Sequence, residues 1–243
     1  MSLTILFLNL FSFTIAVDCS SKSSYIATDS VYSFSLMTLP YDQDFLEPFL
    51  SEDIINSHYK HHHQGYVDKL NSFLEENEDL QSLTLVELNE LASSYDGLQK
   101  YAGGTYNHNL YWWVLTNPEC AKSYPEGDLA SKILETWDSV DTFLQSFNDE
   151  MTKVFGSGWV WGCVNMEGNI EIRSTKNQIN PIMQIDSESC YPFLACDIWE
   201  HAYYLQYNWD RQEYFDAFFD SIDWNVVEFF YESYSSSLLS APF

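Results

Sequence analysis

The sequence predicts an α+β protein, with an N-terminal helical hairpin domain and a C-terminal domain in which helices flank a three-stranded antiparallel sheet. Three observations predict this plan. Residues 51–76 repeat apolar side chains at spacings of three and four, as one face of a helix does. Residues 158–174 form two strand-like segments around Glu167-Gly168, which is typical of a hairpin. The aromatic-rich segments from Glu200 onward return to a helical pattern.

Start and stop signals define the N-terminal helices. Ser51 can accept a hydrogen bond from the first turn of the first helix. A second, short helix is expected from Thr84, because Glu87 three residues later completes a capping box. A third helix is expected over residues 98–116, where the following Asn-Pro pair ends it.

The second half of the chain alternates helix and strand patterns. One or two helices are expected over residues 127–155. Strands are expected over 158–166, 169–174 and 192–199, because these segments are apolar or alternate between apolar and polar residues. Helices are expected from Glu200 to the end of the periodic pattern.

Residues 3–17 form an apolar run without a charge. The run is short for a membrane span and suits the apolar region of a signal peptide, although the first basic residue comes only at Lys22. A retained apolar anchor is the alternative. We expect the secretory pathway or the extracellular space as the destination, or an organelle reached by that route, and no stable membrane span in the mature protein. The expected divisions are a signal peptide (1–17), a linker or presequence remnant (18–38), an N-terminal helical domain (39–117) and a C-terminal α/β domain (118–243).

The charge of the chain excludes two classes of partner. The sequence has 10 Lys and Arg against 36 Asp and Glu, a formal net charge of −26. Such a chain does not bind nucleic acid or an anionic membrane by electrostatic attraction. The acidic residues are dispersed, which favours a solvated acidic surface over a dedicated site for cations or basic partners.

The five cysteines are too few for a disulfide-based scaffold. Cys163 and Cys196 lie in apolar runs, so we expect buried thiols at both positions. A secreted chain could form one disulfide, and the sequence does not identify it. No C-x-x-C pair is present, which leaves a zinc or dithiol site without support.

Four of the six histidines lie within residues 58–63. In an α-helix, His58 and His62 share one face with Tyr66, and His61 and His63 point elsewhere. Such a cluster is either a solvated patch or a source of metal ligands. Its place inside an apolar stripe with aromatic neighbours favours ligands.

The other two histidines also have suggestive neighbours. His108 lies in the aromatic segment NHNLYWW, where a simple core histidine is the alternative. His201 follows Asp197 by four residues, and Asp197 ends an apolar strand. A buried carboxylate needs a partner, and a metal ion suffices. Three imidazoles and one carboxylate suit Mn or Fe, although spacing alone does not single out His58 among the clustered histidines.

Over residues 39–234 the chain resembles the iron/manganese superoxide dismutase family. The segment DIWEHAYY, residues 197–204, matches the family signature D-x-W-E-H-A-Y-Y. Further matching blocks occur in the same order as in the family: AGGTYNHNLYWW, GSGWVW and RSTKNQINP. The resemblance implies the dismutation of two superoxide anions and two protons to O2 and hydrogen peroxide. It assigns one Mn (preferred) or Fe ion per subunit to His58, His108, Asp197 and His201.

The resemblance also assigns roles around the metal. It places Tyr66 and His62 at the substrate gateway and Gln178 beside the bound solvent. It implies an aromatic shell and a subunit interface, and therefore a homodimer or homotetramer. The shell residues are Trp112, Trp159 and Trp161, and the interface residues are Glu200 and Tyr204.

Metal preference depends on which position supplies a glutamine. Iron-type members carry it shortly before the second histidine ligand, where this chain has Gly104. Manganese-type members carry it after the hairpin, where this chain has Gln178. This hydrogen bond sets the pKa of the bound solvent and the reduction potential, so the pattern favours manganese. Tyr106 and Tyr111 are more iron-like, which leaves a dual-metal enzyme as an alternative.

Two other functions remain open from the residues alone. One is a secreted metal-binding structural protein that keeps the fold without turnover. The other is a different iron enzyme, such as an oxygenase, although such enzymes use a three-ligand face. Because the net charge opposes an anionic substrate, we also expect Lys60, His62 and Arg211 to make the approach to the site less negative.

Overall fold

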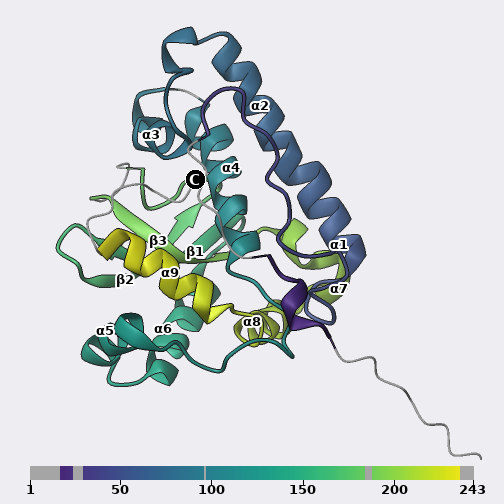
Figure 1. Cartoon of the computed structure of the whole chain (residues 1–243), viewed down its shortest axis with the longest axis vertical. Coiled ribbons are helices and arrows are strands. Elements are labelled where there is room, and N and C mark those ends of the chain that lie inside the picture. The colour runs from purple at the N-terminus through teal and green to yellow at the C-terminus, as the bar shows by residue number, and fades with distance from the viewer. Residues whose placement is uncertain (1–16, 24–29, 96, 184–187, 236–243) are drawn as a thin grey trace, which may run out of the picture.

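The computed structural model describes residues 17–23, 30–95, 97–183 and 188–235 (Figure 1). The predicted signal peptide therefore lies, apart from Val17, outside the described residues. None of the described helices has the length and apolar character required to cross a membrane.

The N-terminal part is helical, as predicted. Its helices are α1 (Glu52–Ser57), α2 (Gln64–Glu75), α3 (Leu85–Glu90) and α4 (Leu98–Trp113). Helices α1 and α2 run along one side of the molecule as one long helix, and α4 lies between α2 and the sheet (Figure 1). Thr84 and Glu87 form the predicted capping box at the start of α3. Helix α4 ends before residue 116 because the backbone of residues 114–116 bonds to residues 221–223 instead.

The C-terminal part contains the predicted antiparallel sheet, in the order β2-β1-β3. Its strands are β1 (Gly158–Asn165), β2 (Ile170–Lys176) and β3 (Cys190–Asp197). Its α-helices are α5 (Gly127–Trp137), α6 (Val140–Lys153), α7 (Tyr204–Tyr207), α8 (Arg211–Phe219) and α9 (Trp224–Ser235). The predicted α+β fold class is confirmed.

The described part of the expected linker, residues 18–38, packs against the folded domains. The Lys22 ammonium is nearly buried and donates to the carbonyls of Trp113 and Leu115 and to the Asp223 carboxylate, at 2.9, 2.7 and 2.6 Å. Phe34 is buried in the core. Ordered structure therefore begins before residue 39, where the sequence pattern placed it.

The structure contains two disulfides, whereas the sequence analysis allowed for one. Cys19 pairs with Cys120, and Cys163 pairs with Cys190. The prediction of a buried thiol is wrong for Cys163 and right for Cys196. Cys163 and Cys190 meet because β1 and β3 are neighbours, in a register that shifts at Cys163. The Cys19–Cys120 bond spans 101 residues, and chain entropy gives such a crosslink roughly 4–5 kcal/mol of stabilisation.

Candidate metal centre

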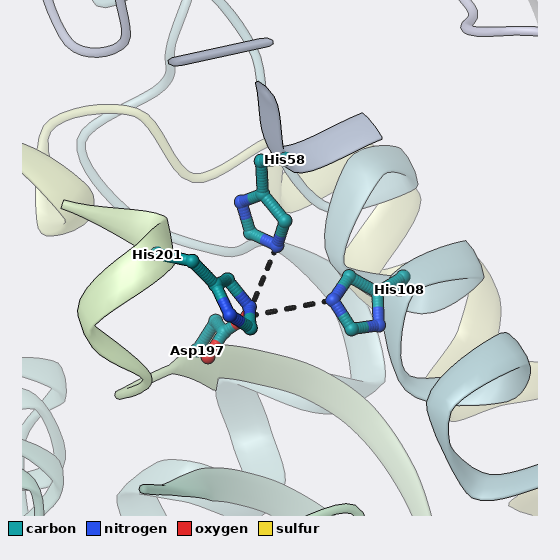
Figure 2. A group of neighbouring side chains, drawn as sticks. All are labelled: His58, His108, Asp197 and His201. Atoms are coloured by element: carbon teal, nitrogen blue, oxygen red, sulfur yellow. Dashed lines mark hydrogen bonds and ion pairs between the residues drawn. The ribbon is translucent and has the colours of Figure 1, made fainter. Parts of the chain in front are cut away.

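Four separate elements bring His58, His108, Asp197 and His201 together (Figure 2). His58 begins a π-helical segment between α1 and α2, and His108 lies in α4. Asp197 ends β3, and His201 lies in the 3-10 turn that follows. One candidate ligand atom from each residue lies within 4.8 Å of all the others.

The three imidazoles converge on one carboxylate oxygen. The Nε2 atoms of His58, His201 and His108 lie 3.1, 3.2 and 3.7 Å from Oδ2 of Asp197. Nε2 of His58 and Nε2 of His108 are buried without a hydrogen-bond partner. His108 Nδ1 lies 2.6 Å from the Gly104 carbonyl and donates to it, which leaves the lone pair of Nε2 facing the cluster. Orphaned nitrogen atoms around a carboxylate fit a bound cation.

Burial keeps the imidazoles of His58 and His108 neutral, and neighbouring histidines keep the Asp197 carboxylate ionised. Burial lowers the pKa of His58 to about 4 and the pKa of His108 well below its ordinary value. Burial alone would raise the pKa of Asp197, but His201 and His58 outweigh it and lower that pKa. Neutral imidazoles and an ionised carboxylate are the forms that bind a metal ion.

The π-helical segment changes the face on which His63 lies. The α-helical pattern predicted that His63 points away from the site, and this prediction is wrong. A π-helix adds a residue to the turn, which brings His58 and His63 to the same interior side. His63 is fully buried, its Nδ1 accepts from Trp112 Nε1 at 3.2 Å, and its ring stacks on His108. His62 stacks on His201, with ring centroids 4.2 Å apart.

Gln178 and Tyr66 meet beside the cluster. Gln178 is buried, and its Nε2 donates to the Tyr66 hydroxyl at 3.1 Å. The Tyr66 ring packs on His108, and burial raises the pKa of its phenol. Asn107 Nδ2 and Trp159 Nε1 both donate to Gln178 Oε1, at 3.0 and 3.1 Å.

The predicted aromatic shell surrounds the ligands in two layers. Trp112 packs against His58, with ring centroids 4.7 Å apart, and Trp159 packs against His108 at 5.1 Å. Trp161 stacks behind Trp159 and does not extend the inner layer. All three tryptophans are fully buried. The shell therefore excludes water from the histidine side of the cluster.

Sequence reasoning missed Trp199, which lies closer to the ligands than Trp161. Its backbone N–H donates to Oδ1 of Asp197 at 2.8 Å, and its ring stacks on His201. The signal was available, because Trp199 is the third residue of DIWEHAYY. Glu200 and Tyr204 of the same motif lie exposed on this single chain, so their role at an interface stays a prediction.

Fold and site together define a mononuclear metalloprotein whose three-histidine, one-carboxylate centre lies between a helical domain and an α+β domain. Residues 33–116 match the alpha-hairpin domain of iron/manganese superoxide dismutases, and residues 125–229 match their C-terminal domain. The chain is also 34% identical over 206 residues to the "Superoxide dismutase [Mn]" of Acinetobacter baylyi, covering 84% of this chain and 90% of that protein. The chain belongs to the iron/manganese superoxide dismutase family, and it is an oxidoreductase that acts on superoxide.

Proposed function

We propose that the protein converts two superoxide anions and two protons to O2 and hydrogen peroxide at a single manganese centre. The observation that carries the proposal is the buried cluster of His58, His108, Asp197 and His201. When bound, a Mn or Fe ion supplies the one-electron redox change that the reaction needs. Three imidazoles, of which those of His58 and His108 are fully buried, and one buried carboxylate fit such an ion.

The chain's own residues hold protons and exclude water. Tyr66 holds its phenolic proton at neutral pH, and burial raises its pKa further above the ordinary value. Its hydroxyl accepts from Gln178, so the phenolic proton points away from that amide. Trp112 and Trp159 close the opposite side of the ligands. These contacts confine proton exchange to the side of the site occupied by Tyr66.

The choice of manganese over iron is supported by the surroundings of Gly104. A Cβ atom added at this position would lie 2.4 Å from carbon atoms of the Tyr66 ring. The iron-type glutamine therefore has no room there, and Gln178 supplies the amide from the other domain.

Metal analysis and a superoxide dismutation assay on the purified protein test this function. We expect about one Mn ion per chain and activity that is lost on removal of the metal and restored by Mn. Restoration by Fe alone would contradict the choice of metal. A protein that binds Mn without dismutation would instead support the alternative of a secreted metal-binding structural protein.

A pocket beside the site supports an approach for an anionic substrate. Its volume is about 350 Å³, and Tyr66, Gln178 and Trp199 line it together with one cationic side chain, Lys100. Of the three residues expected to reduce the negative potential, only His62 contacts the ligands, by stacking on His201. The others bond elsewhere: Lys60 donates to Gln43 and Arg211 donates to the Val154 carbonyl.

We predict that Lys100→Glu lowers kcat/KM several-fold at low ionic strength. The reversed charge would repel superoxide at the pocket. Added salt would weaken this repulsion, because the Debye length is roughly 10 Å at 0.1 M ionic strength. Lys122→Glu is the matched control, because Lys122 pairs with Glu126 outside the pocket and the change in net charge is equal. Equal losses in the two variants, or a steep rise in the activity of the unmodified protein with added salt, would contradict local attraction at Lys100.

Secretion is the proposed route, with cleavage before Cys19. Two disulfides suit an oxidising compartment. Cys19 and Lys22 are held by the crosslink and by three hydrogen bonds, so they belong to the mature protein.

Intact-mass measurement of the protein from its native source tests this route. We expect an N-terminus between residues 16 and 19 and a single free thiol, at Cys196. A mass that retains Met1, or three free thiols, would contradict the proposal.

The proposed assembly is a homodimer. Tyr204, Leu205 and Trp209 form an apolar surface next to Glu200, and Trp209 is 83% exposed. Such side chains favour burial against a partner. Sedimentation equilibrium of the unmodified protein and of Trp209→Lys tests this proposal. We expect a dimer for the unmodified protein and weaker association for Trp209→Lys, and a monomeric unmodified protein would overturn the proposal.

A further inference from the structure

Beyond the site, four buried amide side chains form a continuous hydrogen-bonded chain that ends at Tyr66. They are Asn89, Asn180, Asn107 and Gln178, each at most 2% exposed. Asn89 lies in α3 and Asn107 in α4, whereas Gln178 and Asn180 follow β2. The chain of amides therefore crosses from the helical domain to the sheet domain. Its members face no solvent, so their orientations are set by one another and by the backbone.

The backbone fixes the orientation of Asn180. The N–H of Ile182 donates to Asn180 Oδ1 at 3.2 Å, so this atom is the carbonyl oxygen. Nδ2 of Asn180 must then donate, and it does so to Oδ1 of Asn89 at 2.7 Å and to Oδ1 of Asn107 at 2.9 Å. Both of its hydrogens are used.

Asn89 anchors the far end of the chain in the same way. Its Nδ2 donates to the carbonyls of Leu85 and Ala102, at 2.8 and 3.3 Å. Because both partners are carbonyl oxygens, Asn89 Oδ1 is the atom that faces Asn180. Reversing this amide would place its oxygen against the carbonyl oxygens of Leu85 and Ala102.

The orientation of Asn180 passes through Asn107 to Gln178. Oδ1 of Asn107 accepts from Asn180, so its Nδ2 faces Gln178 and donates to both the backbone and side-chain oxygens there, at 3.1 and 3.0 Å. Trp159 Nε1, which can only donate, reaches the same Gln178 Oε1. Gln178 must therefore turn its NH2 group toward Tyr66.

We propose that Asn180 is a positioning residue, which holds Gln178 as a donor to Tyr66 through Asn107. The Asn180 side chain bonds to Asn89, to Asn107 and to the Ile182 N–H, and of these partners Asn107 is the one that bonds to Gln178. A fully satisfied buried network of this kind is rigid, and its loss is felt by every member. The inference rests on the proposed function, in which Gln178 and Tyr66 serve the reaction.

The test is Asn180→Asp, which keeps the shape of the side chain. The carboxylate of aspartate supplies no donor where the amide supplies two, so the oxygens of both Asn89 and Asn107 lose their partner. Asn107 is then free to turn its NH2 group toward the carboxylate, and Gln178 loses its fixed orientation. We expect the reduction potential of the Mn-loaded protein to shift, together with the pH at which its visible spectrum changes. We expect kcat to fall roughly tenfold, as for other partners outside the ligand set.

Asn117→Asp is the matched control. Asn117 is equally buried, donates to the carbonyls of Phe45 and Glu47, and accepts from the N–H of Glu119. Its replacement removes the same donors outside the amide chain. We expect a lower melting temperature and an unchanged reduction potential.

The outcomes separate a positioning role from a structural one. A shift in potential for Asn180→Asp and none for Asn117→Asp supports the proposal; an unchanged potential and spectral pH in Asn180→Asp overturns it. If Asn180→Asp does not fold, Asn180→Ser, which retains one donor, is judged by the same two measurements. The reduction potential can be measured whether or not the protein turns over superoxide. A failure of the proposed function can therefore be told apart from a failure of the positioning role of Asn180.

Discussion

His108→Ala is expected to abolish metal binding and to reduce dismutation by at least about 100-fold, beyond the usual cost of losing a partner outside the ligand set. The imidazole comes from the middle of α4, and its Nε2 faces the cluster because Nδ1 bonds to the Gly104 carbonyl. Alanine would leave Asp197 buried with one fewer imidazole beside it. Elemental analysis and the dismutation assay measure both effects.

The control for this variant is His61→Ala. His61 belongs to the same run of histidines, yet its side chain is exposed and lies outside the cluster. We expect this variant to keep its metal and its activity. Equal metal content in His108→Ala and the unmodified protein would refute the assignment of the centre.

Gly104→Ala is expected to impair the site by displacing the Tyr66 ring. The added Cβ would lie 2.4 Å from two carbons near the base of the Tyr66 ring, and these atoms cannot move without displacing the whole side chain. Alanine gains about 1 kcal/mol of helix propensity over glycine. Overpacking in a tight core costs roughly 1–3 kcal/mol, and here it also breaks the bond from Gln178 to Tyr66. We therefore expect lower stability and a large loss of kcat.

Gly65→Ala is the matched control for Gly104→Ala. Gly65 lies in α2 with no atom within 4 Å of an added Cβ. Helix propensity then acts alone, and we expect the variant to be up to about 1 kcal/mol more stable with unchanged activity. Denaturant unfolding and kcat measure both variants. A Gly104→Ala protein that matches Gly65→Ala in both would contradict the predicted clash.

Local patterns were enough to predict the order of helices and strands. The capping box at Thr84 and the hairpin around Gly168 depend on residues close together in sequence, and the structure contains both. The segment DIWEHAYY held Asp197 and His201 at a fixed spacing, so half of the metal cluster could be read from one motif.

Contacts between distant residues could not be read in this way. The pairing of Cys163 with Cys190 depends on the register of β1 and β3. Lys22 reaches Asp223 because both bond to the backbone of residues 113–115, at the end of α4. His63 was misplaced because nothing in the residue types distinguishes a π-helical turn from an α-helical one. The π-helical turn places His58 and His63 together in the interior, where both are fully buried.

The sequence by itself determined the fold class, the family resemblance and the residues that could bind a metal, because these depend on residue types and short spacings. The tertiary structure alone decided how four side chains from separate elements converge within 4.8 Å. It also decided how Gln178 acts there, because the packed structure turns its NH2 group to the Tyr66 hydroxyl and places Gly104 against the Tyr66 ring. Both features depend on tertiary packing, which brings together residues that lie far apart in the sequence. No local sequence pattern records such contacts.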